Sequence, residues 1–407
     1  MTASPDTAAS AVPGHVPAER VIDMSYEAYT SAGDDPYLAV AKLHEGTGID
    51  WCTDVLFGTP GWVISRNAYV QEAFSDWETF SSDYRALEPL GITWKLNPLE
   101  FDPPEHHYYR FILNPFFTPA RVREMDAPVQ AACDELIDRF AARGSCEFIS
   151  EFAEMFPSHV FLDLMGMPKD KLEDFLEWER LMLREKDMMK RAGAMLSVLR
   201  YMEEFVRQQR ENPTTELLRG MVGATYNKER PLTEEELLGM CYLFYIGGLD
   251  TVYSVLGWVM RHLAGDVALQ DRLRDNPDLL PGAVEEFMRA FGVATPTRRV
   301  RRDCEFHGVQ MKAGDVVVLS TPAASRDPLA YDEPHRIDIE RKGRHVSFAT
   351  GPHICLGMHL ARREIRMVIE TFLARFRNIR IAEGEQYEYH SGGVFGIDRL
   401  PLEWDPV

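Results

Sequence analysis

The sequence predicts a mostly α-helical fold with a minor β portion, and three observations support this prediction. Apolar residues recur every three or four positions across residues 121–212, which is the spacing of amphipathic helices. Residues 240–260 form a second apolar run in which Asp250 is the only charge. Segments with β-strand character are short, at residues 61–65, 306–310 and 316–319.

The N-terminal segment is predicted to be an arm outside the folded domain. Residues 1–20 are rich in Ala and Pro and lack the apolar stretch of a signal peptide, so we expect them to be flexible. A helical pattern follows at residues 67–74. A length of 407 residues allows two or three domains. However, no internal repeat, low-complexity tract or linker divides the chain, and we expect residues 21–407 to form a single domain.

A helix start is predicted within residues 101–111. Asp102 is expected to cap this helix, with Pro103 at the first helical position and Glu105 two positions later, as in a capping box. The long helical region beyond it is expected to be interrupted at residues 166–168 and at Gly193.

The apolar run is predicted to be a central core helix. Thr233 and Glu236 form a capping box that opens it. Its 21 residues match a membrane span of about 20 residues, but Asp250 at the midpoint would cost roughly 2.5–3.5 kcal/mol. Gly247 and Gly248 weaken an isolated helix by about 1 kcal/mol each. We therefore expect no membrane span, and the lone buried acid indicates a function.

Composition excludes several classes of protein. The 44 basic and 64 acidic residues give a net charge of −20, which disfavours nucleic acid as the main partner. The six cysteines are far apart and form no CxxC pair, which disfavours a disulfide scaffold, an iron–sulfur cluster and a four-cysteine zinc site. A reducing cytoplasm is the expected location.

Residues 348–357 form a glycine-bracketed loop that delivers Cys355 to the start of the last strong helix, predicted from Gly357 to Arg375. The helix N-terminus is expected to lower the pKa of the thiol and favour the thiolate. Such a thiolate could be a nucleophile, a haem ligand, or a zinc ligand together with His353 and His359. Zinc usually needs four ligands, and only three candidates cluster here. The remaining alternative is a buried cysteine that acts as a small hydrophobic residue.

The pattern Phe348, Gly351, Cys355 and Gly357 resembles the haem-binding loop of the cytochrome P450 family. Four fixed positions recur by chance in roughly one chain in a thousand. Three further matches occur in the family's order: His106 with Arg110, residues 247–251, and Glu286 with Arg289, for which Arg336 is the expected later arginine. The nearest resemblance is to the bacterial camphor 5-monooxygenase group, through residues 247–252, 305–310 and 360–365.

The resemblance implies a cytochrome P450 fold with a long central helix over haem b, iron protoporphyrin IX. It assigns Cys355 as the axial ligand of the haem iron. It implies that Thr251 binds dioxygen by a hydrogen bond and that Asp250 relays protons, so that a C–H bond is hydroxylated with O2. The other haem contacts that it implies are His106, Arg110, Gly247, Arg298, Phe348, His353 and Gly357.

The substrate is expected to be a compact, largely hydrocarbon molecule such as a terpenoid or an ionone-like ketone. Trp94 matches the position at which the camphor enzymes place a tyrosine that holds the substrate's ketone. The other positions that match the family's substrate pocket are all apolar: Leu243, Ile246, Ala294 and Val394.

Electrons are expected from a [2Fe-2S] ferredoxin with an NADH-dependent reductase. Residues 341–366 carry six basic side chains against Glu364, a local charge of +5, which leaves −25 for the remainder. This basic patch predicts docking of an acidic partner through Arg341, Lys342, Arg344, Arg362 and Arg363. We expect a soluble, monomeric, bacterial enzyme. A peroxide-driven peroxygenase, a non-enzymatic haem sensor or carrier, and a zinc or thiol enzyme remain alternatives.

Overall fold

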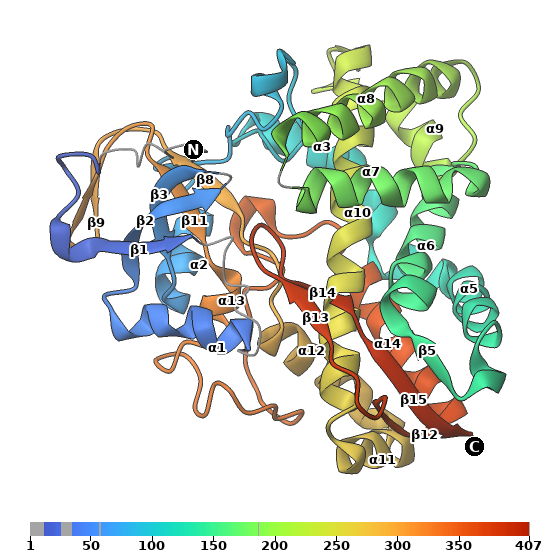
Figure 1. Ribbon diagram of the computed structural model, residues 1–407. Helices are drawn as coiled ribbons and strands as arrows, with labels where there is room; N and C mark the ends of the chain where they lie inside the picture. Colours follow the sequence, from blue (N-terminus) through green and yellow to red (C-terminus); the bar gives the residue numbers. More distant parts are fainter. Residues whose placement is uncertain (1–11, 26–34, 57, 186, 407) are drawn as a thin grey trace, which may run out of the picture.

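The computed structural model describes residues 12–25, 35–56, 58–185 and 187–406. The molecule is mostly helical with a smaller β portion, as predicted. The long helix α10 (Glu234–Leu263) runs through its middle, with a strand-rich part on one side and most of the helices on the other (Figure 1).

The predicted central helix is confirmed. Thr233 Oγ1 accepts a hydrogen bond from Glu236 N at 3.1 Å, and the Glu236 carboxylate accepts one from Thr233 N at 2.7 Å, which completes the capping box. In the described part of the chain, α10 is the one helix long and apolar enough to cross a membrane, but 61% of its apolar window is buried inside the protein. It packs against α6 (Met155–Met165), α8 (Met188–Glu211) and α14 (Met358–Arg375), so it is a core helix.

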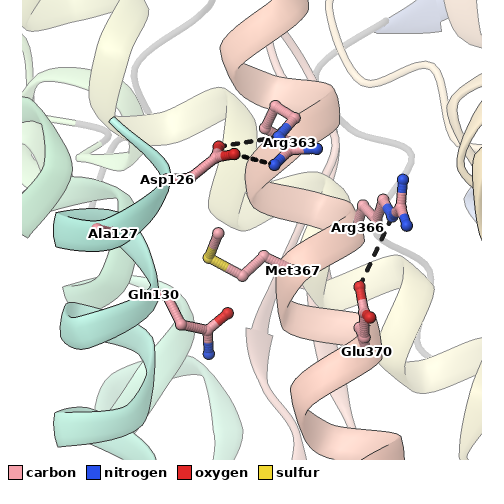
Figure 2. A pocket seen from close by; sticks show the side chains of 7 residues that line it. All are labelled: Asp126, Ala127, Gln130, Arg363, Arg366, Met367 and Glu370. Carbon is pink, nitrogen blue, oxygen red and sulfur yellow. Dashed lines mark hydrogen bonds and ion pairs between the residues drawn. The ribbon is translucent and has the colours of Figure 1, made fainter. Parts of the chain in front are cut away.

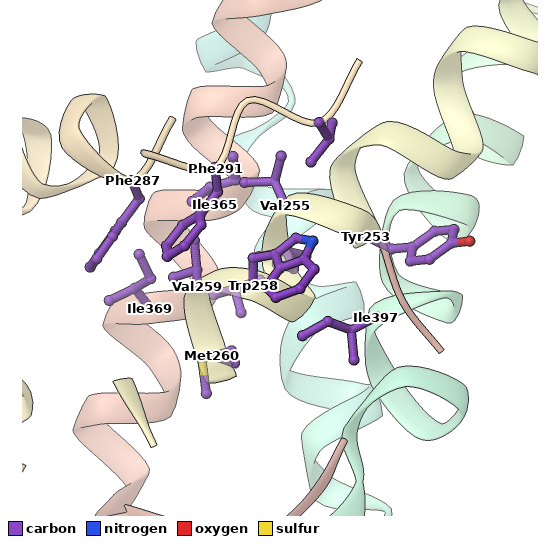
Figure 3. Packing of buried hydrophobic residues seen from close by; sticks show 14 of the residues in the cluster. Tyr253, Val255, Trp258, Val259, Met260, Phe287, Phe291, Ile365, Ile369 and Ile397 are labelled. Atoms are coloured by element: carbon purple, nitrogen blue, oxygen red, sulfur yellow. The ribbon is translucent and has the colours of Figure 1, made fainter. Parts of the chain in front are cut away.

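The C-terminal half of α10 lies in the largest hydrophobic core. Trp258 packs between Phe291, which directly follows α12 (Leu280–Ala290), and Ile397 of β14 (Gly396–Arg399) (Figure 3). Its indole N–H donates to Phe395 O at 3.0 Å. A second core surrounds the N-terminal half, where α7 (Leu172–Arg184) and α8 cover it. α10 is therefore fixed at both ends, with its middle turns between the two cores.

A six-stranded sheet forms the strand-rich part of the molecule. Its central pair, β3 (Thr59–Ile64) and β11 (Val316–Leu319), is parallel, and β11 covers the predicted strand at residues 316–319. The predicted strand at residues 306–310 is instead a hairpin, β9 (Cys304–Phe306) and β10 (Val309–Met311), because Gly308 turns the chain at a φ of 78°. The strand order is β1 (Val21–Ser25), β2 (Ile49–Leu56), β3 (Thr59–Ile64), β11 (Val316–Leu319), β8 (Thr297–Val300), β4 (Phe80–Ser81).

Two predicted features of the helical half differ in the structure. α8 continues through Gly193, because a single glycine only weakens a helix that packing supports, whereas Gly166 ends α6 in a left-handed conformation as expected. Asp102 does not cap the next helix, α3 (Glu105–Leu113). Its carboxylate instead accepts hydrogen bonds from Ser81 Oγ and Ser82 N, so this acid joins α3 to the sheet.

The remaining elements complete the two halves of the molecule. The other α-helices are α1 (Pro36–Ala41), α2 (Asn67–Ser75), α4 (Pro119–Glu124), α5 (Asp126–Asp138), α9 (Glu216–Val222), α11 (Val267–Asp275) and α13 (Thr321–Ala324). The other strands are β5 (Ser145–Glu147), β6 (Thr225–Tyr226), β7 (Arg230–Pro231), β12 (Phe376–Ile381), β13 (Glu388–His390) and β15 (Pro401–Pro406).

The predicted N-terminal arm lies partly outside the described residues, which exclude residues 1–11. In the described part, Val16 is buried and His15 Nε2 lies 2.9 Å from Asp315 Oδ2. Residues 12–20 therefore pack against the sheet.

Candidate active site

One cavity of about 1050 Å³ lies between the middle of α10 and the loop that carries Cys355. Phe244, Gly247 and Thr251 line it from α10, at a spacing that places them on one face of the helix. Cys355 and Gly357 line it from the loop. The volume is at the upper end of the range for small-molecule sites, so this cavity can hold a cofactor and a substrate together.

The cysteine loop is shaped by one strained turn and two backbone contacts. Gly351 has a φ of 69°, and a Cβ there would lie 2.9 Å from Phe74 O, so only glycine fits. Cys355 N donates to Phe348 O at 2.8 Å, and Arg110 Nη1 donates to Ile354 O at 2.7 Å. Gly357 caps α14, as the sequence predicts to within one residue.

The thiol of Cys355 does not have the lowered pKa that the sequence predicts. Burial raises its pKa, and this effect exceeds the lowering by the Gly357 N–H and by the cations Arg110 and Arg362. A helix terminus contributes at most about 2 kcal/mol, so for this sulfur the cost of burial outweighs it. A metal cation bound at this sulfur would favour the thiolate, because a coordinating thiol is deprotonated outright.

A zinc site is not supported at this loop. Across the described ranges, no three His, Cys, Asp or Glu side chains come together in a way that could hold a metal ion, so His353, Cys355 and His359 do not converge. His353 instead lies against His106, with ring centroids 4.2 Å apart, and its Nε2 lies 3.0 Å from Ser82 Oγ.

One end of the cavity is strongly cationic. Arg298 is buried, and burial lowers its pKa to about 10. Burial and the neighbouring arginines lower the pKa of His106 to about 3 and that of His353 to about 2, so both rings are neutral. Neither ring nitrogen of His106 has a hydrogen-bond partner among the residues that the structure describes. Two arginines and an unsatisfied imidazole therefore face a space that suits an anion.

The helix below the cavity is held by an ion-pair network that differs from the prediction. Glu286 and Arg289 are both buried and joined by two hydrogen bonds of 2.9 Å. The later arginine is Arg341, whose Nε lies 3.2 Å from Glu286 Oε1. The prediction that Arg336 is this partner is wrong. The Arg336 side chain is exposed and pairs with Glu333. Only its backbone carbonyl accepts a hydrogen bond from Arg289. The chain turns back at this loop, which brings residue 341 rather than residue 336 over Glu286.

The predicted docking patch is largely neutralised by ion pairs. Arg341 is a structural residue with a side chain 14% exposed, so its predicted docking role is wrong. Arg362 forms two hydrogen bonds with Glu285, at 2.5 and 3.0 Å. Figure 2 shows Arg363 paired with Asp126, and Arg366 near Glu370, in a groove between α5 and α14. In this predicted patch, Lys342 and Arg344 are the exposed cations that form no ion pair with the described residues.

The distal side of the cavity holds buried acids instead. The Asp250 side chain is 2% exposed, and neither of its carboxylate oxygens accepts a hydrogen bond from the described residues. Its nearest cation is Arg184, with Nη2 3.6 Å from Oδ1. Glu179 is buried nearby, and burial together with the charge of Asp250 raises its pKa well above the usual value. Thr251 Oγ1 donates to Gly247 O at 3.2 Å, which leaves this hydroxyl beside the cavity.

The predicted pocket residues are mostly in place. Leu243, Ile246, Ala294 and Val394 line the cavity. Trp94 does not: its ring packs edge-on against Tyr242, 6.0 Å away, so this alignment was wrong. Lining residues that the sequence did not reveal are Tyr84, Phe117, Phe161, Leu183, Arg191, Met195 and Phe244.

Comparisons with known proteins agree with this geometry. A family model described as Cytochrome P450 matches residues 167–387. The probable cytochrome P450 127A1 of Sinorhizobium fredii is 36% identical over 97% of each chain. The chain belongs to the cytochrome P450 family. The crystal structure of CYP101J2 superposes with a TM-score of 0.87 at 31% identity, covering 97% of this chain and 99% of that one. The steroid C26-monooxygenase of Mycobacterium tuberculosis (strain CDC 1551 / Oshkosh) is 29% identical over 76% of this chain and 86% of its own.

This P450 is therefore a haem-thiolate monooxygenase that binds haem b, and its structural neighbours are of the bacterial camphor-like group. The residues present fit that cofactor. A Cβ built at Gly247 or Gly357 meets no atom within 4 Å, so both faces of the space are open to a flat group. The cationic end with Arg110, Arg298 and the unpartnered His106 suits the two haem carboxylates.

Proposed function

We propose that this P450 hydroxylates a compact, largely hydrocarbon substrate with O2 and electrons from a ferredoxin. The observation that carries the proposal is the single cavity, which has Cys355 on one side and Thr251 with Asp250 on the other. Bound haem supplies the activation of oxygen and its transfer to a C–H bond. In this proposal Cys355 ligates the iron, and Phe348, Gly357 and Gly247 flank the ring.

The haem carboxylates have a defined set of partners in this proposal. Arg110 and Arg298 supply charge-assisted hydrogen bonds, and His106 and His353 supply neutral donors. Glu286 and Arg289 hold the helix below, with Arg341 in place of Arg336. These residues fix the cofactor's orientation relative to α10.

Thr251 and Asp250 are the proposed catalytic residues. The Thr251 hydroxyl is positioned to hydrogen-bond bound dioxygen, and Asp250 to bring protons to it. Burial raises the pKa of Asp250 while Arg184 lowers it, so the two protonation states are closer in free energy than for an exposed acid. This pair favours a dioxygen-dependent monooxygenase over a peroxide-driven peroxygenase or a haem carrier, neither of which needs a proton relay.

The lining of the cavity supports an apolar substrate with one acceptor atom. Phe117, Phe161, Leu183 and Met195 supply apolar surface. Among the described lining residues Tyr84 is the only phenol, and burial raises its pKa, so it remains a hydrogen-bond donor. We assign to Tyr84 the ketone-holding role that the sequence placed at Trp94. A terpenoid or ionone-like ketone is the proposed substrate class.

The redox partner is proposed to be a [2Fe-2S] ferredoxin with its NADH-dependent reductase. Lys342 and Arg344 are the exposed cations that remain beside the cysteine loop. We also propose that residues 21–407 act as one domain and that the enzyme is monomeric and cytoplasmic. The bacterial origin of the relatives supports this setting.

A spectral titration tests the substrate class. Terpenoid ketones should shift the Soret band of the ferric enzyme towards the high-spin position, and the tightest binders should be hydroxylated in the presence of ferredoxin, reductase and NADH. Tyr84→Phe should weaken binding of the ketones about tenfold while leaving binding of the matching hydrocarbons unchanged. If ketones and hydrocarbons lost affinity equally, or if no small terpenoid shifted the spectrum, the proposed substrate class would be contradicted.

A further inference from the structure

Asp250 is connected to the surface by a chain of charged contacts that ends in the β13–β14 hairpin. Arg184 Nη1 lies 3.0 Å from Asp398 Oδ1, while its Nη2 lies 3.6 Å from Asp250 Oδ1. His390 Nδ1 lies 2.9 Å from the same Asp398 oxygen. The Asp398 side chain is 32% exposed, compared with 2% for Asp250. One guanidinium therefore serves two carboxylates, one buried and one in contact with solvent.

The hairpin holds its two groups in fixed positions. His390 lies opposite Gly396 across the strand pair. A Cβ at Gly396 would lie 2.5 Å from His390 Cε1, so the imidazole packs directly on the glycine. β14 in turn packs against α10, which carries Asp250. Arg184 is the last residue of α7, and its Cζ lies 5.3 Å from the Tyr253 ring centroid.

The charges around Asp250 act in opposite directions. Burial raises its pKa most, Arg184 and His390 lower it, and Asp398 raises it. Glu154 Oε1 lies 3.9 Å from Arg184 Nη1 and forms a third ion-pair contact with this guanidinium. The titratable and charged groups that face this cluster are Glu154 before α6, Glu179, Arg180 and Arg184 on α7, His390 on β13, and Asp398 on β14.

We propose that Asp398 and His390 are positioning residues that control the proton exchange of Asp250 by dividing Arg184 between two carboxylates. Arginine stays protonated in proteins, so Arg184 acts as a movable counter-charge and not as a proton donor. When Arg184 lies towards Asp250 the buried carboxylate stays ionised, and when it lies towards Asp398 the buried carboxylate takes up a proton from solvent. The inference rests on the proposed relay role of Asp250.

Two substitutions on the hairpin should shift Asp250 in opposite directions. Asp398→Asn removes the competing carboxylate, so Arg184 turns to Asp250 and the pKa of Asp250 falls by about one unit. His390→Gln removes the imidazole that contacts Asp398 and leaves Asp398 freer to hold Arg184, so the pKa of Asp250 rises. Glu385→Gln is the matched control, because it removes the 2.7 Å ion pair with Arg399 next to the same hairpin without a contact to Arg184.

The measurement is an infrared pH titration of the Asp250 carboxyl band in the ferric holoenzyme, with the band assigned by its loss in Asp250→Asn. Shifts of opposite sign in Asp398→Asn and His390→Gln support the inference. No shift, or shifts of the same sign, would overturn it. The relay itself is judged separately: fully coupled turnover in Asp250→Asn would contradict the relay while the titration still decides the role of the hairpin.

Discussion

Carboxylates are paired with arginines on one side of the cavity and only weakly paired on the other. On the proximal side, below Cys355, Glu286 is bound by Arg289 and Arg341, and Glu285 by Arg362. On the distal side, Asp250 and Glu179 are buried with unsatisfied carboxylate oxygens, and Arg184 approaches Asp250 no closer than 3.6 Å. Paired charges fix a geometry, whereas weakly paired buried acids can change protonation. This difference supports the proposal that the proximal side holds the cofactor and the distal side moves protons.

The largest expected effect is the loss of a paired charge on the proximal side. Glu286→Gln leaves the buried Arg289 and the partly buried Arg341 without their carboxylate, which should cost about 3–5 kcal/mol of unfolding free energy and reduce haem content. Chemical denaturation and the haem-to-protein ratio measure this. Arg336→Gln is the control, because its exposed pair with Glu333 should contribute less than about 0.5 kcal/mol. Equal losses in both variants would restore Arg336 as the partner.

Glu364 tests whether the proximal side has an exception. It is buried on α14, and burial raises its pKa to about 8. Because its pKa is higher in the folded than in the unfolded protein, the folded state binds a proton more tightly between these two values. The free energy of unfolding should therefore fall as pH rises from about 4.5 to about 8. Glu364→Gln should remove this slope and be more stable than the wild type by up to about 5 kcal/mol at pH 9. Parallel slopes in thermal melts from pH 5 to 9 would contradict a neutral Glu364.

Substitutions on the distal side should change the coupling of the reaction but not the stability of the fold. Thr251→Ala should lower coupled product formation by roughly 10²-fold, with NADH consumed and hydrogen peroxide released, because the hydroxyl that steers protons is lost. The melting temperature should change little. Thr251→Ser keeps the hydroxyl and should retain coupling. The ratio of product to NADH decides the outcome, and tight coupling in Thr251→Ala would remove Thr251 from the proton path.

The smallest expected effect concerns the surface cations. Arg344→Glu should slow electron transfer from ferredoxin about threefold at low salt, with the difference lost at high salt, because exposed charges steer association and are screened. Stopped-flow reduction of the haem measures the rate. Arg207→Glu on α8 makes the same change in charge away from the cysteine loop and should have no effect. Equal slowing in both variants would show that only net charge matters.

Features set by neighbours in the chain could be predicted from the sequence. The Thr233–Glu236 capping box and the strand at residues 316–319 were correct because hydrogen bonds three residues apart and continuous apolar runs are local properties. The cysteine loop and residues 247–251 of α10 were located through their resemblance to family motifs, each of which is continuous in the sequence. Asp102 and Gly193 were wrong because tertiary contacts outweighed local preference.

Features set by chain reversals could not be predicted. Arg341 rather than Arg336 reaches Glu286 because of how one loop folds back, and Tyr84 rather than Trp94 lines the cavity. The contact between Arg184 and Asp250 joins α7 to α10 and leaves no signal in either segment. The pKa of Cys355 was predicted in the wrong direction because burial, which the sequence does not show, exceeds the effect of the helix terminus.

The ferrous–carbonyl spectrum tests the central claim most directly, namely that Cys355 and Thr251 face opposite sides of one thiolate-ligated haem. Wild type and Thr251→Ala should both show the strongly red-shifted Soret band of thiolate ligation, and Cys355→Ala should lose it. A red-shifted band that persisted in Cys355→Ala would contradict the account.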